Sequence, residues 1–233
     1  MSIIIKSLSK TYSNNKVLND INLTFNKGKI HGVIGENGAG KTTLFKCIAG
    51  IEKYDNGIVD YTEGILKNQI GFLPTNPFFL SKITGLEYLQ LLCNARGIKL
   101  NNIKTNNIFD LPLKQYATTY STGMKKKLAL TGILIQKNEV FILDEPFNGV
   151  DIQSNILIKE IIFKLKQLNK IIIISSHIFS ILSEVCDKLY YLKQGSIIKS
   201  VEKNSFNQIE NEMKEIGIMK KINELGLIYD TIS

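Results

Sequence analysis

Hydrophobic and polar residues alternate along the first thirty residues of the chain, as in "IIIKSLSKTY" and "VLNDINLTF". This period of two is typical of half-buried antiparallel strands. From residue 30 onward, short apolar runs are separated by segments with helical periodicity. Buried strands that alternate with helices indicate a parallel sheet covered on both faces. The predicted strands of this sheet are "KIHGVIG" (29–35), "QIGFLP" (69–74), "EVFILDEP" (139–146) and "KIIIISS" (170–176).

Two further segments differ from this pattern. Residues from about 76 to 135 have helical periodicity, an Asn-rich connector at 101–107 and no convincing strand, which predicts a helical subdomain inserted into the α/β core. We therefore expect one domain over residues 1–202, with an N-terminal antiparallel β subdomain, followed by a charged tail at 203–233. The apolar residues of the tail recur at helical spacing: Ile209, Met213 and Ile216.

Charge and cysteine content exclude several classes of protein. A net charge of +8 suggests an anionic partner. The excess is lysine scattered through the chain, however, and Arg96 is the single arginine, so we expect no nucleic acid as a partner. Cys47, Cys93 and Cys186 lack the spacing of a zinc site or a disulfide framework, and a reducing cytosol is expected. No apolar run approaches the roughly 20 residues that cross a bilayer, and the first residues lack the features of a signal peptide.

The strongest local motif is "GENGAGKTT" at residues 35–43, which fits GxxxxGK[ST]. It follows a predicted strand and opens a predicted helix that ends near Gly50, as a phosphate-binding loop requires. Glycines let the backbone wrap a phosphate chain, Lys41 reaches the terminal phosphates, and the Thr42 hydroxyl can bind Mg²⁺. The motif therefore predicts a nucleoside triphosphate site. Its residues are Gly35, Glu36, Asn37, Gly38, Ala39, Gly40, Lys41, Thr42 and Thr43.

A second motif, "VFILDEP" at 140–146, is an apolar strand that ends in two carboxylates. Asp144 is expected to hold magnesium through water, and Glu145 to orient or deprotonate an attacking water. An acidic pair at a strand end is also a common exit from a strand to a loop. Its combination with the phosphate loop favours the hydrolytic interpretation.

Together these residues resemble the nucleotide-binding subunit of ATP-binding cassette (ABC) transporters, over nearly the whole chain to about residue 200. The resemblance implies a P-loop NTPase fold, ATP and Mg²⁺ as cofactors, and a signature motif, usually LSGGQ, at "YSTGM". This motif departs from the family's at its first, third and fifth positions. It keeps the Ser121 hydroxyl and the bare backbone at Gly123, which are implied to contact ATP. The lysines behind it are expected to form a solvated face: Lys125, Lys126 and Lys127.

Several single positions also match the family's pattern in order. Tyr12 falls where the family stacks an aromatic ring on adenine, and Asp151 of "NGVD" resembles the residue near the dimer interface. His177 resembles the histidine that contacts the γ-phosphate and positions water, whereas His31 is expected to be an ordinary strand residue. Thr75 stands where the family usually has glutamine or glutamate as a magnesium and water ligand, so its hydroxyl is a candidate magnesium ligand through water, and Asn76 is a neighbouring candidate.

The resemblance implies an ATPase subunit that dimerises head to tail around two ATPs, with a second copy as the expected partner, and drives a separate membrane permease. The chain would then lie at the cytoplasmic face of the membrane, held there by the permease. The permease is expected to contact the helical insertion near residues 75–92. Phe78 and Phe79 are candidate contacts unless both belong to the core. The form "YSTGMKKKL" looks like that of subunits that serve exporters, which favours export.

Two other functions stay open from the residues alone. A soluble single-cassette ABC ATPase of an assembly pathway would have the same motifs. Ribosomal members of the family usually carry two cassettes and DNA-repair members a long coiled coil, and neither feature is present in this sequence. A P-loop kinase would leave "YSTGM" and "NGVD" without a task. Cell fractionation separates a transporter subunit from an assembly factor, and a phosphate-acceptor assay detects a kinase.

Overall fold

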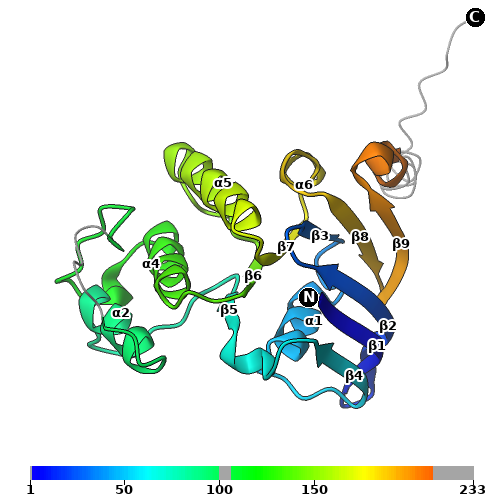
Figure 1. The fold of residues 1–233 in the computed structure, drawn as a ribbon, viewed down its shortest axis with the longest axis horizontal. Helices are drawn as coiled ribbons and strands as arrows, with labels where there is room; N and C mark the ends of the chain where they lie inside the picture. Colours follow the sequence, from blue (N-terminus) through cyan, green and yellow to red (C-terminus); the bar gives the residue numbers. More distant parts are fainter. Residues whose placement is uncertain (1, 100–105, 212–233) are drawn as a thin grey trace, which may run out of the picture.

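The computed structural model describes residues 2–99 and 106–211 and places their strands in two sheets (Figure 1). The smaller sheet is antiparallel with the order β2-β1-β4, which confirms the N-terminal prediction and adds one strand that was not predicted. Along its first strand Ile3 and Ile5 are buried, whereas Lys6 is exposed, because alternate side chains point to opposite faces. The strands are β1 (Ser2–Tyr12), β2 (Asn15–Asn26) and β4 (Asn56–Tyr61).

The larger sheet has the order β5-β6-β7-β3-β8-β9 and is parallel from β5 to β8. All four strands predicted from apolar runs lie in it, side by side at one end. A final antiparallel hairpin, β8 with β9, was not predicted; it turns at Gln194 and Gly195, which both have positive φ. The strands are β3 (Ile30–Ile34), β5 (Ile70–Leu73), β6 (Val140–Asp144), β7 (Ile171–Ser176), β8 (Lys188–Lys193) and β9 (Ser196–Glu202).

The two faces of the larger sheet build two separate cores. Along β7, Ile171 and Ile173 pack toward α1 and the smaller sheet, whereas Ile172 and Ile174 pack toward α4, α5 and α6. Figure 1 shows α1 between the two sheets and α5 and α6 on the opposite side. None of the described helices is long and apolar enough to cross a bilayer. The helices are α1 (Lys41–Ile48), α2 (Gly85–Asn94), α4 (Thr122–Ile135), α5 (Ile152–Gln167) and α6 (Phe179–Val185), with short 3-10 turns η1 (Leu66–Asn68), η2 (Ala117–Thr119) and η3 (Lys203–Ser205).

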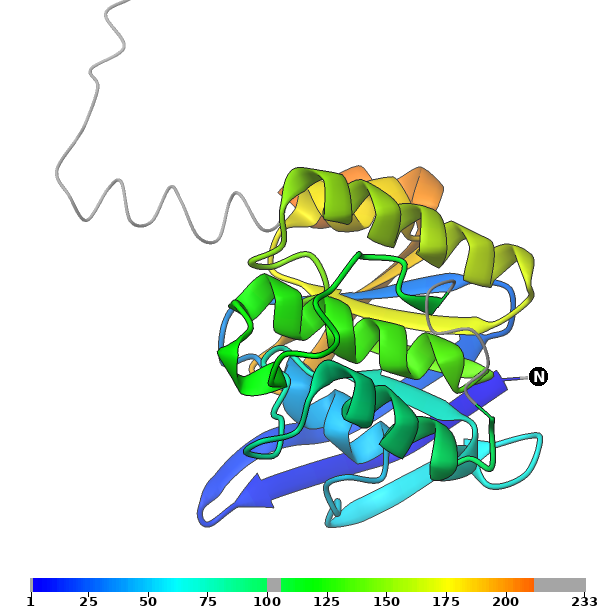
Figure 2. The ribbon, with the colours of Figure 1, turned by 90° about the vertical axis from the view of Figure 1, so that its left-hand side faces the viewer.

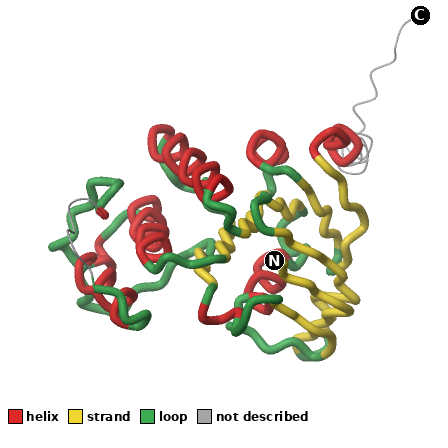
Figure 3. The backbone as a smooth tube through the Cα atoms, viewed as in Figure 1, coloured by secondary structure: helices red, strands yellow, loops and turns green. Residues whose placement is uncertain are grey.

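The predicted helical insertion is present: α2 and α4 lie side by side (Figures 1 and 2), with α4 next to the edge strand β5, and both are drawn red in Figure 3. A capping box begins α2, because the Thr84 hydroxyl accepts from the Glu87 amide and the Glu87 carboxylate accepts from the Thr84 amide. Phe78 is 83% exposed, but Phe79 is 6% exposed and its ring edge meets Tyr88. The prediction that Phe79 is available to a permease is therefore wrong, since its ring belongs to the core. Part of the Asn-rich connector, residues 100–105, lies outside the described residues.

The chain returns to the core after β9. Phe206 and Ile209 are buried together with the residues of α5 and α6, and residues 206–211 are helical. Met213 and Ile216 lie outside the described residues, so the helical character of the tail beyond residue 211 stays a prediction, as does the domain boundary at residue 202.

His31 is a buried residue of β3, as predicted. Its ring contacts those of Phe25 and Tyr190, and its Nε2 lies within hydrogen-bond distance of the backbone of Asn26. Burial lowers the pKa of this imidazole to about 4, because the charged form loses its hydration. His31 is therefore neutral at physiological pH and belongs to the core.

Candidate active site

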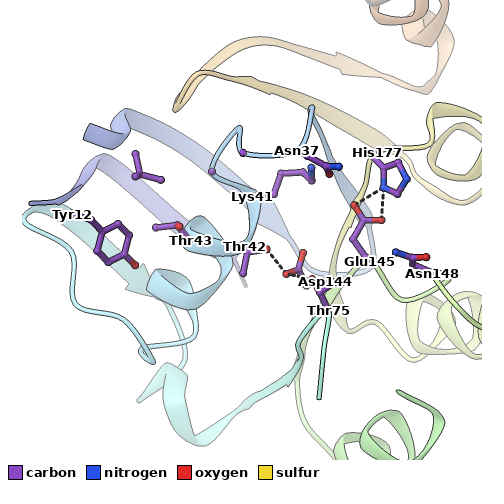
Figure 4. Close-up of a pocket in the computed structure, with 13 residues that line it drawn as sticks. Tyr12, Asn37, Lys41, Thr42, Thr43, Thr75, Asp144, Glu145, Asn148 and His177 are labelled. Carbon is purple, nitrogen blue, oxygen red and sulfur yellow. Dashed lines mark hydrogen bonds and ion pairs between the residues drawn. The ribbon is translucent and has the colours of Figure 1, made fainter. Parts of the chain in front are cut away.

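The motif at residues 35–43 connects the end of β3 to the start of α1, which confirms the predicted strand, loop and helix (Figure 4). Two glycines are required by close approaches of other backbone. A Cβ atom on Gly35 would lie 2.3 Å from the carbonyl oxygen of Leu192. Gly40 has a φ of +107°, and its Cβ would lie 2.9 Å from the carbonyl oxygen of Val17. Only glycine allows the loop to pass this close to β2 and β8.

Lys41 is the first residue of α1, and its side chain folds back over the loop. Its Nζ donates to the carbonyl oxygens of Gly35 (2.7 Å) and Glu36 (3.1 Å). Burial lowers the pKa of the ammonium group, and the nearby carboxylates of Glu145 and Asp144 oppose that shift. The positive charge therefore lies near two loop carbonyls and the two carboxylates at the end of β6 and just after it.

Asp144 is fully buried and accepts hydrogen bonds from three hydroxyl groups. Thr42 and Thr75 both donate to its Oδ2 atom, at 2.6 and 2.7 Å, and Ser175 donates to its Oδ1 atom. Buried carboxylates are stable when such partners replace water. The three hydroxyls come from α1, the loop after β5, and β7, so Asp144 joins three segments that are far apart in the sequence.

Glu145 has the left-handed φ of 51°, which is uncommon for a residue with a side chain. Its amide donates to the Ser175 hydroxyl (2.9 Å). Its two carboxylate oxygens each lie 3.1 Å from Nδ1 of His177, which follows β7. Ser175 was not among the predicted site residues, although two serines at the end of an isoleucine strand indicate a polar environment there.

These side chains surround one pocket of about 580 Å³ (Figure 4). Tyr12 stands at its outer side and is 41% exposed. Two of the lining residues, Val17 and Asn148, were not predicted. Three predicted residues, Gly35, Glu36 and Ala39, lie in the loop but not on the wall of this pocket. The lining residues are Tyr12, Val17, Asn37, Gly38, Gly40, Lys41, Thr42, Thr43, Thr75, Asp144, Glu145, Asn148 and His177.

Ser121, Gly123 and Asp151 do not line this pocket. Ser121 is the N-cap of α4, and its hydroxyl accepts from the amide of Met124 (3.3 Å). Asp151 is the N-cap of α5, where hydrogen bonds from Ser154 and Lys127 hold the pKa of the carboxyl well below its usual range. The structure therefore brings the phosphate loop, the two carboxylates and His177 together, and leaves the signature motif apart from them.

The prediction of a solvated lysine face is wrong at Lys126. This side chain is 1% exposed, and its Nζ donates to the carbonyl oxygens of Glu145 (2.7 Å) and Asn148 (2.8 Å). Its neighbour Lys127 is partly exposed and pairs with Asp151 (3.1 Å). A run of three lysines on a helix points in three directions, since successive residues are about 100° apart, and the middle one faces the core here.

Comparison with known proteins places this architecture in a family. Residues 18–148 match the ABC transporter family. A bacitracin transport ATP-binding protein, BcrA, of Enterococcus faecalis is 32% identical, over 91% of this chain and 73% of its own length. The chain belongs to the ABC transporter family. Other relatives are the lantibiotic transport protein SrtF of Streptococcus pyogenes, 30% identical over 88% of this chain and 93% of its own, and NatA of Bacillus subtilis, 33% identical over 78% and 80%.

Solved structures of ABC proteins have the same fold. An ATP-binding subunit of an ABC transporter superposes with a TM-score of 0.78 at 24% identity, covering 93% of this chain and 95% of the other. A cassette in a dimeric post-hydrolysis state bound to ADP and Pi also has a TM-score of 0.78, at 18% identity, covering 86% and 98%. The predicted α/β fold is confirmed. The chain is an ATP-binding subunit of an ABC transporter and an ATPase.

Proposed function

We propose that ATP binds in the pocket at the ends of β3, β6 and β7. The observation that carries this proposal is the convergence of Lys41, Asp144, Glu145 and His177 from separate segments on that one pocket. The amides of loop 35–43 and the N-terminus of α1 hold the phosphates, and the Lys41 ammonium exchanges its loop carbonyls for phosphate oxygens. The Tyr12 ring stacks on adenine at the outer end.

Thr42, Asp144 and Thr75 are the proposed magnesium ligands. Their oxygens already meet at one point, Oδ2 of Asp144, and hydroxyl and carboxylate oxygens are the donors that Mg²⁺ prefers. The donor set therefore fits the ion. Bound there, Mg²⁺ would neutralise charge on the β- and γ-phosphates.

Glu145 is the proposed general base and takes a proton from the attacking water. Its carboxylate lies on the pocket wall and within hydrogen-bond distance of His177 Nδ1, so the imidazole fixes the direction of the carboxylate. His177 also contacts the γ-phosphate through the other edge of its ring. Ser175 supports both acidic residues: its hydroxyl proton goes to the Asp144 carboxylate, and its oxygen accepts from the backbone amide of Glu145.

The substitution Glu145→Gln tests this site. It keeps the shape and removes the base, so hydrolysis is expected to fall by roughly 10² to 10⁴ while ATP binding persists. Retained ATP is then expected to hold a dimer, visible by size-exclusion chromatography with ATP and Mg²⁺. Glu184→Gln on the surface of α6 is the matched control. Normal turnover by Glu145→Gln, or a monomer at high concentration, would remove Glu145 from this role.

The proposed dimer is a head-to-tail pair of identical chains. Ser121 and Gly123 lie outside the pocket of their own chain, which supports a role at the pocket of a second chain. The N-terminal turn of α4 then offers its amides and a hydroxyl to the γ-phosphate of the neighbour. Asp151 at the start of α5 pairs with Lys127 beside this turn, which supports its proposed position at the dimer interface.

The proposed partner is an integral membrane permease that exports its substrate and holds this subunit at the cytoplasmic face. Relatives named for bacitracin and lantibiotic transport support export. Exposed apolar side chains on the helical insertion support the contact: Phe78, Leu80 and Leu91.

Membrane association of Phe78→Asp tests this partner. The variant is expected to bind ATP but to be lost from the membrane fraction of cells that contain the permease. Ile51→Asp, which is similarly exposed outside the insertion, is the control and should remain with the membranes. If folded Phe78→Asp protein still sediments with membranes, this docking surface is wrong. If the unchanged protein itself stays out of the membrane fraction, the assembly-pathway ATPase is favoured instead.

A further inference from the structure

The helix α4 carries a buried cation that the ATPase mechanism above does not use. The two carbonyl oxygens that accept from Lys126 Nζ, those of Glu145 and Asn148, belong to the two ends of the turn that follows β6. An ammonium group in the interior is tolerated only when hydrogen bonds replace its hydration. Lys126 does not line the pocket, so it contacts neither ATP nor the attacking water.

The backbone of Glu145 requires support at this position. A left-handed φ on a residue with a side chain persists only where the surrounding structure holds it. The peptide group before Glu145 is held by the Ser175 hydroxyl, at 2.9 Å. The peptide group after it is held by Lys126, at 2.7 Å, and by the more distant amide of Asn148, at 3.3 Å. Both peptide groups that set the direction of the Glu145 side chain are thus fixed by other segments.

The contact of Lys126 is the buried centre of a longer interface between α4 and the loop 145–151. One turn earlier on the helix, Gly123 passes so close that a Cβ atom would lie 2.7 Å from the carbonyl oxygen of Gly149. On the outer side, Lys127 pairs with Asp151. The first two turns of α4 and this loop therefore pack as one unit, with a single buried hydrogen-bonding side chain of α4 reaching the catalytic glutamate.

We infer that Lys126 is a positioning residue, which holds the carbonyl group of Glu145 so that the carboxylate points at the attacking water. This inference rests on the proposed role of Glu145 as the base. Lys126 acts on the direction of that side chain and not on ATP. Its loss should therefore slow the chemical step and leave nucleotide affinity in place.

The substitution Lys126→Met tests this role, because it keeps the length of the side chain and removes its charge and donors. Misplacement of a reacting group by about 1 Å can reduce a rate by two orders of magnitude, so kcat is expected to fall about tenfold to a hundredfold. The KM for ATP should stay within about twofold, since no ATP contact is lost. Lys125→Met on the same helix is the matched control and should keep its kcat. If Lys126→Met also keeps its kcat, the inference is wrong.

A double-mutant cycle with Glu145→Gln separates positioning of the base from a general structural effect. If Lys126 acts through Glu145, adding Lys126→Met to Glu145→Gln should lower the residual rate by less than about threefold. Multiplication of the two single effects would overturn the inference. An active Glu145→Gln protein would instead overturn the proposed base, so the two failures differ.

A folding defect in Lys126→Met would not prevent the test. Lys126→Gln keeps an amide that can donate to one of the two carbonyls, and it is expected to fold. Its kcat should lie between those of Lys125→Met and Glu145→Gln, with an unchanged KM for ATP. A kcat equal to that of the control would contradict the inference.

Discussion

Lys41 and Lys126 are bound in the same manner in two different regions of the molecule. Each is nearly fully buried, and each ammonium group donates to two backbone carbonyls. One pair of carbonyls belongs to the phosphate loop and the other to the loop after β6. Burial lowers the pKa of both groups, and the carboxylates of Glu145 and Asp144 oppose the shift in both.

The difference between the two lysines is access to the pocket. Lys41 lines it, so its carbonyl partners can be exchanged for a phosphate. Lys126 is shielded from it and has only the backbone of the loop to bind. In our proposals the same charge on the same kind of partners thus binds a ligand in one region and holds a backbone conformation in the other. Burial and charge alone do not distinguish a binding group from a positioning group.

The largest expected effect comes from Lys41→Ala. Removal of one preorganised electrostatic contact to a transferring phosphoryl group typically raises the barrier by about 3 kcal/mol, a hundredfold or more in rate. Nucleotide affinity should weaken as well, which separates Lys41 from Lys126. Steady-state hydrolysis and titration with a fluorescent ATP analogue measure the two effects. Near-normal turnover with an intact fold would remove the phosphate loop from the mechanism.

The position of Lys41, between β3 and α1 and on the wall of the pocket, was predictable because its motif has a fixed spacing and a mechanical reason for each residue. The burial of Lys126 had a weaker signal that went unused. Lys126, Leu130 and Ile133 recur at helical spacing, and all three are buried on one face of α4. The helical spacing therefore indicated the burial of Lys126, although the lysine-rich composition of the segment indicated exposure. The partners of Lys126 could not be predicted, since they depend on how a loop nineteen residues away packs on α4.

A complementation experiment tests whether Lys41 and Ser121 of different chains act at the same site. In a head-to-tail dimer each site joins the pocket of one chain to Ser121 of the other, so Ser121→Arg and Lys41→Ala should each be inactive alone. Mixed, they form heterodimers with one intact site. Random pairing makes half of the dimers heterodimers, so activity should recover to at most roughly a quarter of that of the unchanged protein.

Lys126 should behave in this assay like Lys41 and not like Ser121, the N-cap residue of the same helix. It acts on Glu145 of its own chain, so Lys126→Met is expected to be complemented by Ser121→Arg but not by Lys41→Ala. ATPase assays of the mixtures over a range of protein concentrations measure this, with each single variant as its own control. Recovery of Lys126→Met by Lys41→Ala would place Lys126 at the neighbour's site. Normal hydrolysis by Ser121→Arg alone would show that "YSTGM" completes no second site.

The fold divides into parts with strong and weak local signals. The strands β3, β5, β6 and β7 are short, apolar and buried on both faces, so composition alone marks them. The strand β4 is largely exposed, and its Ile58 is 58% exposed, so it lacks that signal. The adjacent Phe78 and Phe79 look alike in sequence, yet one is exposed and the other packs on Tyr88. Strand order and loop packing depend on contacts between distant segments, which local patterns do not contain.

The smallest expected effect concerns Thr75, whose neutral hydroxyl supports Asp144 at the end of β6. Thr75→Val keeps the shape and removes one of the three hydroxyls that donate to Asp144. A hydrogen bond to a charged group contributes about 1.5–3 kcal/mol, but Thr42 and Ser175 remain, so we expect the lower end, a loss of about tenfold in kcat/KM. In the Thr75→Val protein the Mg²⁺ concentration for half-maximal activity should also rise. Asn76→Ala is the control.

Thr75→Gln, the residue type usual in the family, should be at least as active as Thr75→Val. If Thr75→Val needs no more Mg²⁺ than the unchanged protein, Thr75 supports neither Asp144 nor the ion, and Thr42 alone orients that carboxylate oxygen.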